Sequence, residues 1–452
     1  MKKIITLLSL LLCLQTKAQT WFVVPDTAFV TYLHTIVPGA MQGDSLDITN
    51  TLVTTTTHTI NVRAKHISNI SGVEYFTSLT KLDCSQNTIT NLPTLTNSLI
   101  WLWCSNNALT SLPVLPSSLQ ILFADTNQLN SIPTPLPNNL INFEVEHNNL
   151  TTLPSVLPNS IKYLICGYNS LDSLPNVLPT SLVYLYCYHN QLTSLPSILP
   201  NSIKYLYCEY NGIGYVPALP TSLLYFYCYD NQITNMPTLP SSIITLACQY
   251  NRLTALPSFP NSLLHLYCFN NHITSLQTLP TSLINLECDH NNLTSLPALP
   301  STLTDLYCDY NNISCFPTFP NSISPSTFNI SSNPFTCLPN YIAAMSVDTI
   351  TYPLCAAGNA HGCPVVAGIS TFNTQNSTFQ IYPNPAQNNF IIEVSNSDKQ
   401  IIQVVDISGK IILSKTITGT TNIDASNLSQ GVYNISLTSN TGITNKRLII
   451  VK

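Results

Sequence analysis

Cysteine is the residue type whose number and spacing in this sequence could most readily carry chemistry. The chain has 15 cysteines among its 452 residues. Ten of them recur at one position of a repeated pattern: Cys84, Cys104, Cys166, Cys187, Cys208, Cys228, Cys248, Cys268, Cys288 and Cys308. Metal binding needs close, convergent ligands, and the sequence has no C-x-x-C pair. Stacked copies of one position point in parallel, so their Cβ atoms hardly converge for disulfides. We therefore predict that these ten thiols, the ladder cysteines, are free, buried and space-filling.

Four more cysteines lie beyond the ladder, at Cys315, Cys337, Cys355 and Cys363. Cys315 and Cys337 each follow a repeated asparagine by four residues, so they hold equivalent positions in adjacent repeats. In an oxidising compartment such a set indicates capping disulfides, for which three connectivities are possible. We favour the pairs Cys315–Cys337 and Cys355–Cys363.

Other chemistry-bearing residues form no motif for catalysis. The sequence lacks G-x-S-x-G, H-E-x-x-H, the phosphate-binding loop and the EF-hand loop. Its nine histidines are scattered. Four acidic residues gather near the end of the repeats, at Glu287, Asp289, Asp305 and Asp309. They allow a calcium site, but we favour a solvated acidic patch, and we expect no enzyme activity, no cofactor and no metal.

Tyrosine gathers on the surface opposite the ladder. Of the 22 tyrosines, 15 lie three or one residues before, or one or two residues after, a ladder cysteine. Period-two alternation turns these positions outward. Such an aromatic surface binds proteins or sugars, whereas a cross-strand ladder that only stiffens the sheet is the alternative. We predict partner-binding residues at Trp101, Trp103, Tyr163, Tyr184, Tyr186, Tyr188, Tyr205, Tyr207, Tyr225, Tyr227, Tyr229, Tyr267 and Tyr307.

The composition excludes several function classes. Charged residues make up only 8% of the chain and the formal net charge is −5. A chain with so few cations cannot neutralise many phosphates, so we expect no nucleic-acid partner. Hydrophobic residues make up 44%, which excludes a disordered chain swollen by charge.

The ladder belongs to a repeat with the skeleton L-x-x-L-x-C-x-x-N-x-L. Its asparagine recurs every 20 to 22 residues, at Asn87, Asn107, Asn127, Asn148, Asn169, Asn190, Asn211, Asn231, Asn251, Asn271, Asn291, Asn311 and Asn333. Ile60 to Ile70 forms a degenerate earlier copy. Residues 60–340 resemble the leucine-rich repeat family, and the return segment L-P-x-L-P-x-S-L is most similar to the short repeats of secreted bacterial effectors. The resemblance implies a solenoid of stacked parallel strands.

The residue types at each repeat position predict the conformation of the return segments and the role of the repeated asparagines. Paired prolines remove backbone donors and fix φ, so the return segments should run extended along the convex side. Such thin segments predict gentle curvature. The repeated asparagines lie where each strand turns outward, and we expect their amides to satisfy backbone groups of neighbouring turns rather than to bind ligands.

Residues 1–18 have the layout of a secretory signal peptide, with Lys2 and Lys3 before an apolar run and cleavage after Ala18.

Both ends of the repeat region are predicted to be capped. Residues 19–59 supply an N-terminal cap, in which Asp26 begins a short helix that Pro38 ends, and Thr54 to Thr57 favour a strand. Residues 341–376 form a C-terminal cap and linker.

Residues 377–452 read as a small antiparallel β-sandwich of about seven strands. Four landmarks appear in order, and they resemble the C-terminal sorting domain of type IX secretion cargo. The residues that carry the resemblance are Tyr382, Pro383, Asn384, Pro385, Asp406, Gly409, Gly431, Tyr433 and Lys452. The resemblance implies the type IX secretion machinery as a partner, and either release or attachment at the outer cell surface.

The fold class expected is therefore mainly β, with a leucine-rich repeat solenoid followed by an antiparallel sandwich. No stretch beyond the leader is long and apolar enough to span a membrane. We predict an exported, non-catalytic recognition protein that binds a protein or glycan ligand on its tyrosine-rich concave face. A structural surface-layer component without selective binding is the alternative.

Overall fold

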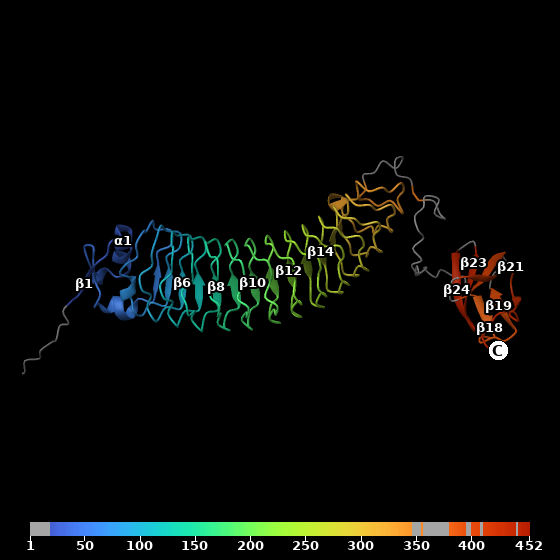
Figure 1. The fold of residues 1–452 in the computed structure, drawn as a ribbon, viewed down its shortest axis with the longest axis horizontal. Helices are drawn as coiled ribbons and strands as arrows, with labels where there is room; N and C mark the ends of the chain where they lie inside the picture. Colours follow the sequence, from blue (N-terminus) through green and yellow to red (C-terminus); the bar gives the residue numbers. More distant parts are fainter. Residues whose placement is uncertain (1–18, 346–353, 356–378, 395–398, 407–409, 440–441) are drawn as a thin grey trace, which may run out of the picture. The chain divides into compact units, whose positions relative to one another are not determined.

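The computed structural model of the chain describes residues 19–345, 354–355, 379–394, 399–406, 410–439 and 442–452. The chain divides into two compact units, Met1–Pro364 and Val365–Lys452 (Figure 1). Within the described ranges, no helix is both long and apolar enough to cross a bilayer. The signal peptide predicted at residues 1–18 and most of the predicted linker lie outside these ranges.

One parallel sheet of 14 strands runs through the first unit, and its strands follow one another in sequence order. The strands are β4 (Thr59–Asn61), β5 (Lys81–Asp83), β6 (Trp101–Trp103), β7 (Ile121–Phe123), β8 (Asn142–Glu144), β9 (Tyr163–Ile165), β10 (Tyr184–Tyr186), β11 (Tyr205–Tyr207), β12 (Tyr225–Tyr227), β13 (Thr245–Ala247), β14 (His265–Tyr267), β15 (Asn285–Glu287), β16 (Asp305–Tyr307) and β17 (Phe328–Asn329). This arrangement confirms the predicted solenoid.

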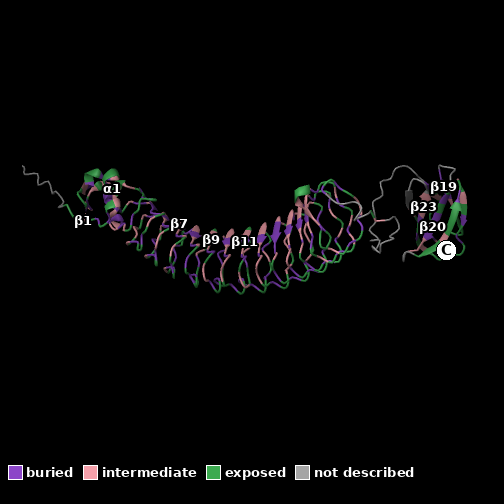
Figure 2. Cartoon of the chain, turned by 90° about the horizontal axis from the view of Figure 1, so that it is seen from above, coloured by how far each residue is buried: buried purple, intermediate pink, exposed green. Residues whose placement is uncertain are grey.

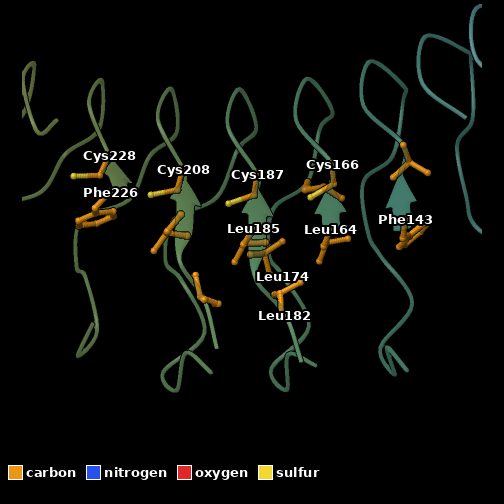
Figure 3. Packing of buried hydrophobic residues seen from close by; sticks show 14 of the residues in the cluster. Phe143, Leu164, Cys166, Leu174, Leu182, Leu185, Cys187, Cys208, Phe226 and Cys228 are labelled. Carbon is orange, nitrogen blue, oxygen red and sulfur yellow. The ribbon is translucent and has the colours of Figure 1, made fainter. Parts of the chain in front are cut away.

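The core lies behind these strands and is built from the leucine and cysteine positions. In β10, Leu185 is fully buried and its two neighbours are half-buried. Figure 3 shows the side chains of Cys187, Cys208 and Cys228 projecting in the same direction from successive turns. All ten ladder cysteines are free and buried, as predicted. Burial raises the pKa of Cys84 to about 12, so the thiols stay protonated and inert.

The return segments carry no helix from β5 to β16, a stretch that the structure describes throughout. In Figure 2 the strands follow the concave side of the solenoid and the return segments follow its convex side. This agrees with the extended segments expected from their prolines.

Each repeated asparagine ties its own turn to the preceding repeat. The Asn211 amide oxygen accepts a hydrogen bond from the backbone N–H of Leu192 at 3.0 Å. Its amide nitrogen lies 3.1 Å from the carbonyl oxygens of Cys187 and Cys208, one in each repeat. The same pattern recurs from Asn107 to Asn311. These asparagines are structural, as the sequence indicated.

The N-terminal cap confirms one prediction and corrects another. Helix α1 (Thr27–Ile36) begins at Asp26, whose Oδ1 accepts from the backbone N–H of Phe29 at 2.9 Å. The threonine-rich segment is not a strand, because Leu52–Thr56 forms a helical turn, η2, with π-type geometry. The hydroxyls of Thr54 and Thr55 donate to carbonyls one turn back, and these local bonds favour the helical turn over β propensity.

The remaining elements of this unit are short. They are β1 (Trp21–Val23), β2 (Met41–Gln42) and β3 (Ser45–Asp47), which form a three-stranded antiparallel sheet, and the 3₁₀ turns η1 (Pro38–Ala40), η3 (Val73–Tyr75) and η4 (Pro325–Thr327).

The favoured disulfide pairing is wrong. Cys337 is bonded to Cys355, 18 residues further along. Cys315 is disulfide-bonded as well, and Cys363 lies outside the described residues. The physical reason is the one that keeps the ladder thiols apart: equivalent positions in adjacent repeats point in parallel. Leu354 instead forms an isolated parallel β-bridge with Leu338 through the backbone, and this pairing brings Cys355 beside Cys337.

The second unit has seven strands in its described residues, in two antiparallel sheets. They are β18 (Phe379–Tyr382), β19 (Asn389–Val394), β20 (Gln400–Val405), β21 (Ile411–Ile417), β22 (Thr421–Asp424), β23 (Gly431–Ser439) and β24 (Gly442–Ile450). Phe379 and Phe390 from one sheet share a buried core with Val404 and Ile435 from the other. The predicted small sandwich is therefore present.

Replacing Asn211 with alanine should destabilise the solenoid. The substitution leaves a backbone donor and carbonyls of two repeats without partners, which should lower the free energy of unfolding by about 2–3 kcal/mol. Urea denaturation followed by circular dichroism measures the change. The control is Asn176→Ala on the exposed convex side, which should change stability by less than about 0.5 kcal/mol. Equal effects of the two substitutions would contradict the bridging role.

Candidate partner-binding surface

The central part of the predicted aromatic face forms two parallel rows across β9 to β12. Strand register places Tyr163, Tyr184, Tyr205 and Tyr225 opposite one another. Their successive ring centroids lie 4.5, 4.4 and 5.2 Å apart with nearly parallel planes. Strand spacing of about 4.8 Å lies within the range of roughly 4.5–7 Å at which the centroids of paired aromatic rings are found, so the backbone register imposes the stack.

The second row runs beside the first, one pleat further along each strand. Tyr186 and Tyr207 stack at 4.3 Å, and Tyr207 meets Tyr227 at 4.6 Å with a 58° tilt. Tyr184 and Tyr186 make an edge-on contact within β10 that joins the two rows. The structure thus brings these predicted residues together as one continuous block.

The tyrosines of the block are half-buried because they cover one another. Parallel neighbours hide the ring faces, so the block presents ring edges and phenol hydroxyls. Burial raises the pKa of Tyr186, Tyr207 and Tyr227, which keeps the phenols protonated and able to donate hydrogen bonds.

A third row follows the strands and includes Tyr188 and Tyr229. The Tyr188 ring crosses over Gly167, where an added Cβ would lie 2.9 Å from ring atom Cε2. The hydroxyl of Tyr188 donates to the carboxylate of Glu146, two repeats away. Glycine at position 167 therefore makes room for a ring that is fixed at both ends, and no pattern in the sequence indicated this contact.

Glu209 lies in the same row, between Tyr188 and Tyr229, and is only 7% exposed. Its Oε2 atom is buried and has no hydrogen-bond partner among the residues that the structure describes. Desolvation raises the pKa of Glu209 to about 7. Period-two alternation places this position, one residue after Cys208, among the outward ones and does not predict its burial.

The residues two positions after each ladder cysteine do not share the strand surface. Tyr168, His189 and Tyr210 have φ angles of 47°, 47° and 53°, in the left-handed region, so they belong to the turn that follows each strand. With His147 they form a separate stack at 4.0 to 4.1 Å. Burial lowers the pKa of His189.

The other predicted binding residues lie apart from the central block. Trp101 and Trp103 contact each other at 5.4 Å near the N-terminal end, and the ammonium of Lys81 lies 3.7 Å from the Trp101 ring centre. In β13, the small residues Thr245 and Ala247 take the row positions and interrupt the stack. Beyond them stand Tyr267, on β14, and Tyr307, on β16.

The acidic residues near the end of the repeats are less solvated than predicted. Asp309 is 7% exposed, and burial together with Asp289 raises its pKa. His290 lies between them, with Nδ1 2.9 Å from Asp289 Oδ2. Ligand atoms of Asp289, His290 and Asp309 lie within 4.8 Å of one another, so a metal ion could be held there. Exposed acidic groups also gather without one, and these contacts alone assign no metal.

The predicted sorting residues help to hold the sandwich. The Asn384 side chain donates to the Arg447 carbonyl at 2.7 Å and accepts from the Ile449 N–H at 2.9 Å, which fastens the turn after β18 to the last strand. Tyr433, near the Gly431 end of β23, donates to the Ser429 carbonyl.

The other sorting residues lie in loops and at the chain end. Lys452 donates to the Ser426 carbonyl, and Asp406 accepts from the Lys410 N–H after β20. Tyr382, Pro383 and Pro385 belong to the turn region at the end of β18, and Gly409 lies outside the described residues. Asn384, Asp406, Tyr433 and Lys452 therefore make hydrogen bonds within this unit, and recognition of the sorting residues by an export machinery stays a prediction.

Comparison with known proteins identifies the second unit by sequence. Residues 380–451 are a secretion system C-terminal sorting domain. This domain implies secretion through the type IX machinery. No curated protein matches the chain.

The solenoid is similar to solved leucine-rich repeat structures. YopM from Yersinia enterocolitica is 32% identical, with a TM-score of 0.52, over 60% of this chain and 63% of that one. YopM from Yersinia pestis, described as a leucine-rich effector protein, is 28% identical, with a TM-score of 0.56, over 71% and 96%. The functional domain of InlJ from Listeria monocytogenes, which includes a cysteine ladder, is 19% identical, with a TM-score of 0.55, over 96% and 100%. The first unit has the leucine-rich repeat fold.

Glu209→Gln should change how stability depends on pH. The Glu209 carboxyl has a pKa of about 7 in the folded chain, above its ordinary value of 4.5. Its contribution to stability is thus complete below pH 4.5 and is lost as the pH rises through 7. The glutamine variant has no carboxyl group to ionise at this position. At pH 8 it should therefore retain about 2–3 kcal/mol of unfolding free energy that the wild type loses. Urea denaturation between pH 5 and 8 measures it, with exposed Asp172→Asn as the control. A parallel profile for wild type and Glu209→Gln would contradict the assigned burial.

Proposed function

We propose that this chain is a secreted or cell-surface recognition protein without catalytic activity. It binds a protein or glycan partner on the concave strand surface, for adhesion or for interaction with another cell. The observation that carries the proposal is the continuous tyrosine block on β9 to β12, which displays ring edges and protonated phenols over four neighbouring repeats.

The chemistry of the block supports recognition. Tyrosine offers a large, rigid contact area with a hydroxyl that donates and accepts, so binding orders few rotatable bonds. Tyr188 and Gly167 add preorganisation, because the ring is already seated before a partner arrives. The ladder thiols are buried and protonated, which supports a role in packing rather than in catalysis.

The sorting domain supports the proposed location. Type IX export delivers its cargo beyond the outer membrane, where a concave recognition surface meets partners directly. The similarity to a leucine-rich effector protein also fits a role in interaction with other proteins.

A structural surface-layer component is the second candidate, and one observation favours it. The rings of Tyr184 and Tyr205 stack at 4.4 Å and 4°, a geometry that by itself stiffens the sheet. The two candidates differ in what happens when the rings are removed without unfolding the repeats.

The double variant Tyr207→Ser, Tyr227→Ser separates the candidates. The partner is first captured with the full secreted chain and then titrated at about 50 and 500 mM salt. Recognition predicts a loss of about 2–4 kcal/mol in binding free energy and weak salt dependence, because few charge pairs form for ions to screen. Unchanged binding together with steep salt dependence would place the site elsewhere on the solenoid.

Removing the second unit should block export. A chain that ends at residue 373 lacks the sorting domain at residues 380–451 and should accumulate in the periplasm. Immunoblotting of periplasm, cell surface and medium measures its distribution, with the full chain as the control. Finding the truncated chain at the surface or in the medium would show that export does not need this domain.

A further inference from the structure

A pocket of about 350 Å³ opens where β5, β6 and β7 end, outside the tyrosine block. Asp83, Trp103 and Phe123 are the last residues of these strands and pair in register. Gln86 and Asn106, both exposed and both with φ of 57°, line the pocket from the turns that follow. The volume lies at the lower end of the roughly 300–1,000 Å³ of small-molecule sites.

Trp103 differs from the central tyrosines in how its ring is covered. It meets Trp101 at 5.4 Å with a 53° tilt and Phe123 at 6.3 Å with a 40° tilt. Neither contact is a parallel stack like that of Tyr186 and Tyr207, whose planes differ by only 7°. An aromatic face left open in this way packs against the C–H groups of a saturated ring, whereas Tyr186 and Tyr207 cover each other's faces.

Two charged groups of the pocket keep free hydrogen-bonding capacity. The Asp83 side chain is only 8% exposed, and its Oδ1 accepts from the N–H and hydroxyl of Ser85. Among the described residues, no group hydrogen-bonds Asp83 Oδ2 or forms an ion pair with Arg63, which lines the same pocket. The pocket therefore holds one carboxylate oxygen and one guanidinium without partners, and their charges sum to zero.

These features select the ligand by charge and by shape. A cationic ligand would be attracted by Asp83 but repelled by Arg63, and an anionic ligand would be attracted by Arg63 but repelled by Asp83. Either ligand would leave one charge of the pocket unpaired. A neutral ligand with several hydroxyls donates to Asp83, accepts from Arg63 and has further partners in the amides of Gln86 and Asn106.

We propose that this pocket binds a neutral sugar unit, with its ring against Trp103 and its hydroxyls shared between Asp83 and Arg63. The inference rests on the proposed function, because the pocket lies at one end of the same concave surface. It names the glycan part of that function and gives it a place distinct from the tyrosine block.

Titration of the full secreted chain with methyl glycosides of neutral hexoses tests the proposal. Tryptophan fluorescence and saturation-transfer NMR report binding, and at least one glycoside should bind saturably. Arg63→Met and Asp83→Asn should each weaken its affinity at least about tenfold, or 1.4 kcal/mol. Arg63 is exposed, so its variant keeps the fold, which thermal melting verifies. The matched control, Trp21→Phe in β1, should keep the wild-type affinity.

Three results would overturn the sugar site. They are no saturable binding of any neutral glycoside, wild-type affinity in both pocket variants, and tighter binding of the charged glucosaminide or glucuronide than of neutral glycosides. Partner titration on the same preparations keeps the two proposals apart. If the chain binds its partner but no neutral glycoside, the pocket proposal is wrong and the tyrosine block stands. If the chain binds a glycoside but the Tyr207→Ser, Tyr227→Ser variant binds the partner as tightly as the wild type, the tyrosine block is wrong and the pocket stands.

Discussion

The amide of one repeated asparagine is the contact on which the rest of the solenoid depends. A strand of three residues makes few backbone hydrogen bonds, and the turn after it leaves donors and acceptors exposed in the interior. Asn211 and its equivalents satisfy these groups in two repeats at once, which fixes each unit against the next. Backbone hydrogen bonds between consecutive strands set the register, and the asparagine contacts support it at the turn that follows each strand. The stacked tyrosines follow from this shared register.

Features that repeat could be predicted from the sequence, because each copy repeats the same physical argument. Leucine and cysteine alternate inward, and proline pairs exclude helices from the return segments. Features that occur once could not. Cys337 bonds to Cys355 because a bridge at Leu338 folds the chain back, which no spacing reveals. The threonines after Thr51 turn helical because their hydroxyls find local carbonyls.

The same distinction holds for the candidate surface, where repeated features could be predicted from the sequence and single features could not. Period-two alternation located the tyrosines, and the interruption at β13 could be read from the small residues Thr245 and Ala247. The burial of Glu209 and the path of Tyr188 over Gly167 depend on which rings lean in which direction, and alternation does not encode that. The left-handed φ of Tyr168, Tyr210, Tyr250 and Tyr310 likewise places these four tyrosines in the turns and not on the strand surface, because the chain must bend there to begin its return.

The uniform register from β9 to β12 also bears on how such a chain can diverge over evolution. Since the backbone and asparagine hydrogen bonds of each unit reach only its two neighbours, recombination that inserts or removes a whole unit leaves these bonds intact. The Tyr188–Glu146 contact spans two repeats and is the exception. One added unit lengthens the concave surface by about 4.8 Å without altering its chemistry. Related chains can therefore match ligands of different length by unit number alone, while single substitutions at the aromatic positions adjust selectivity.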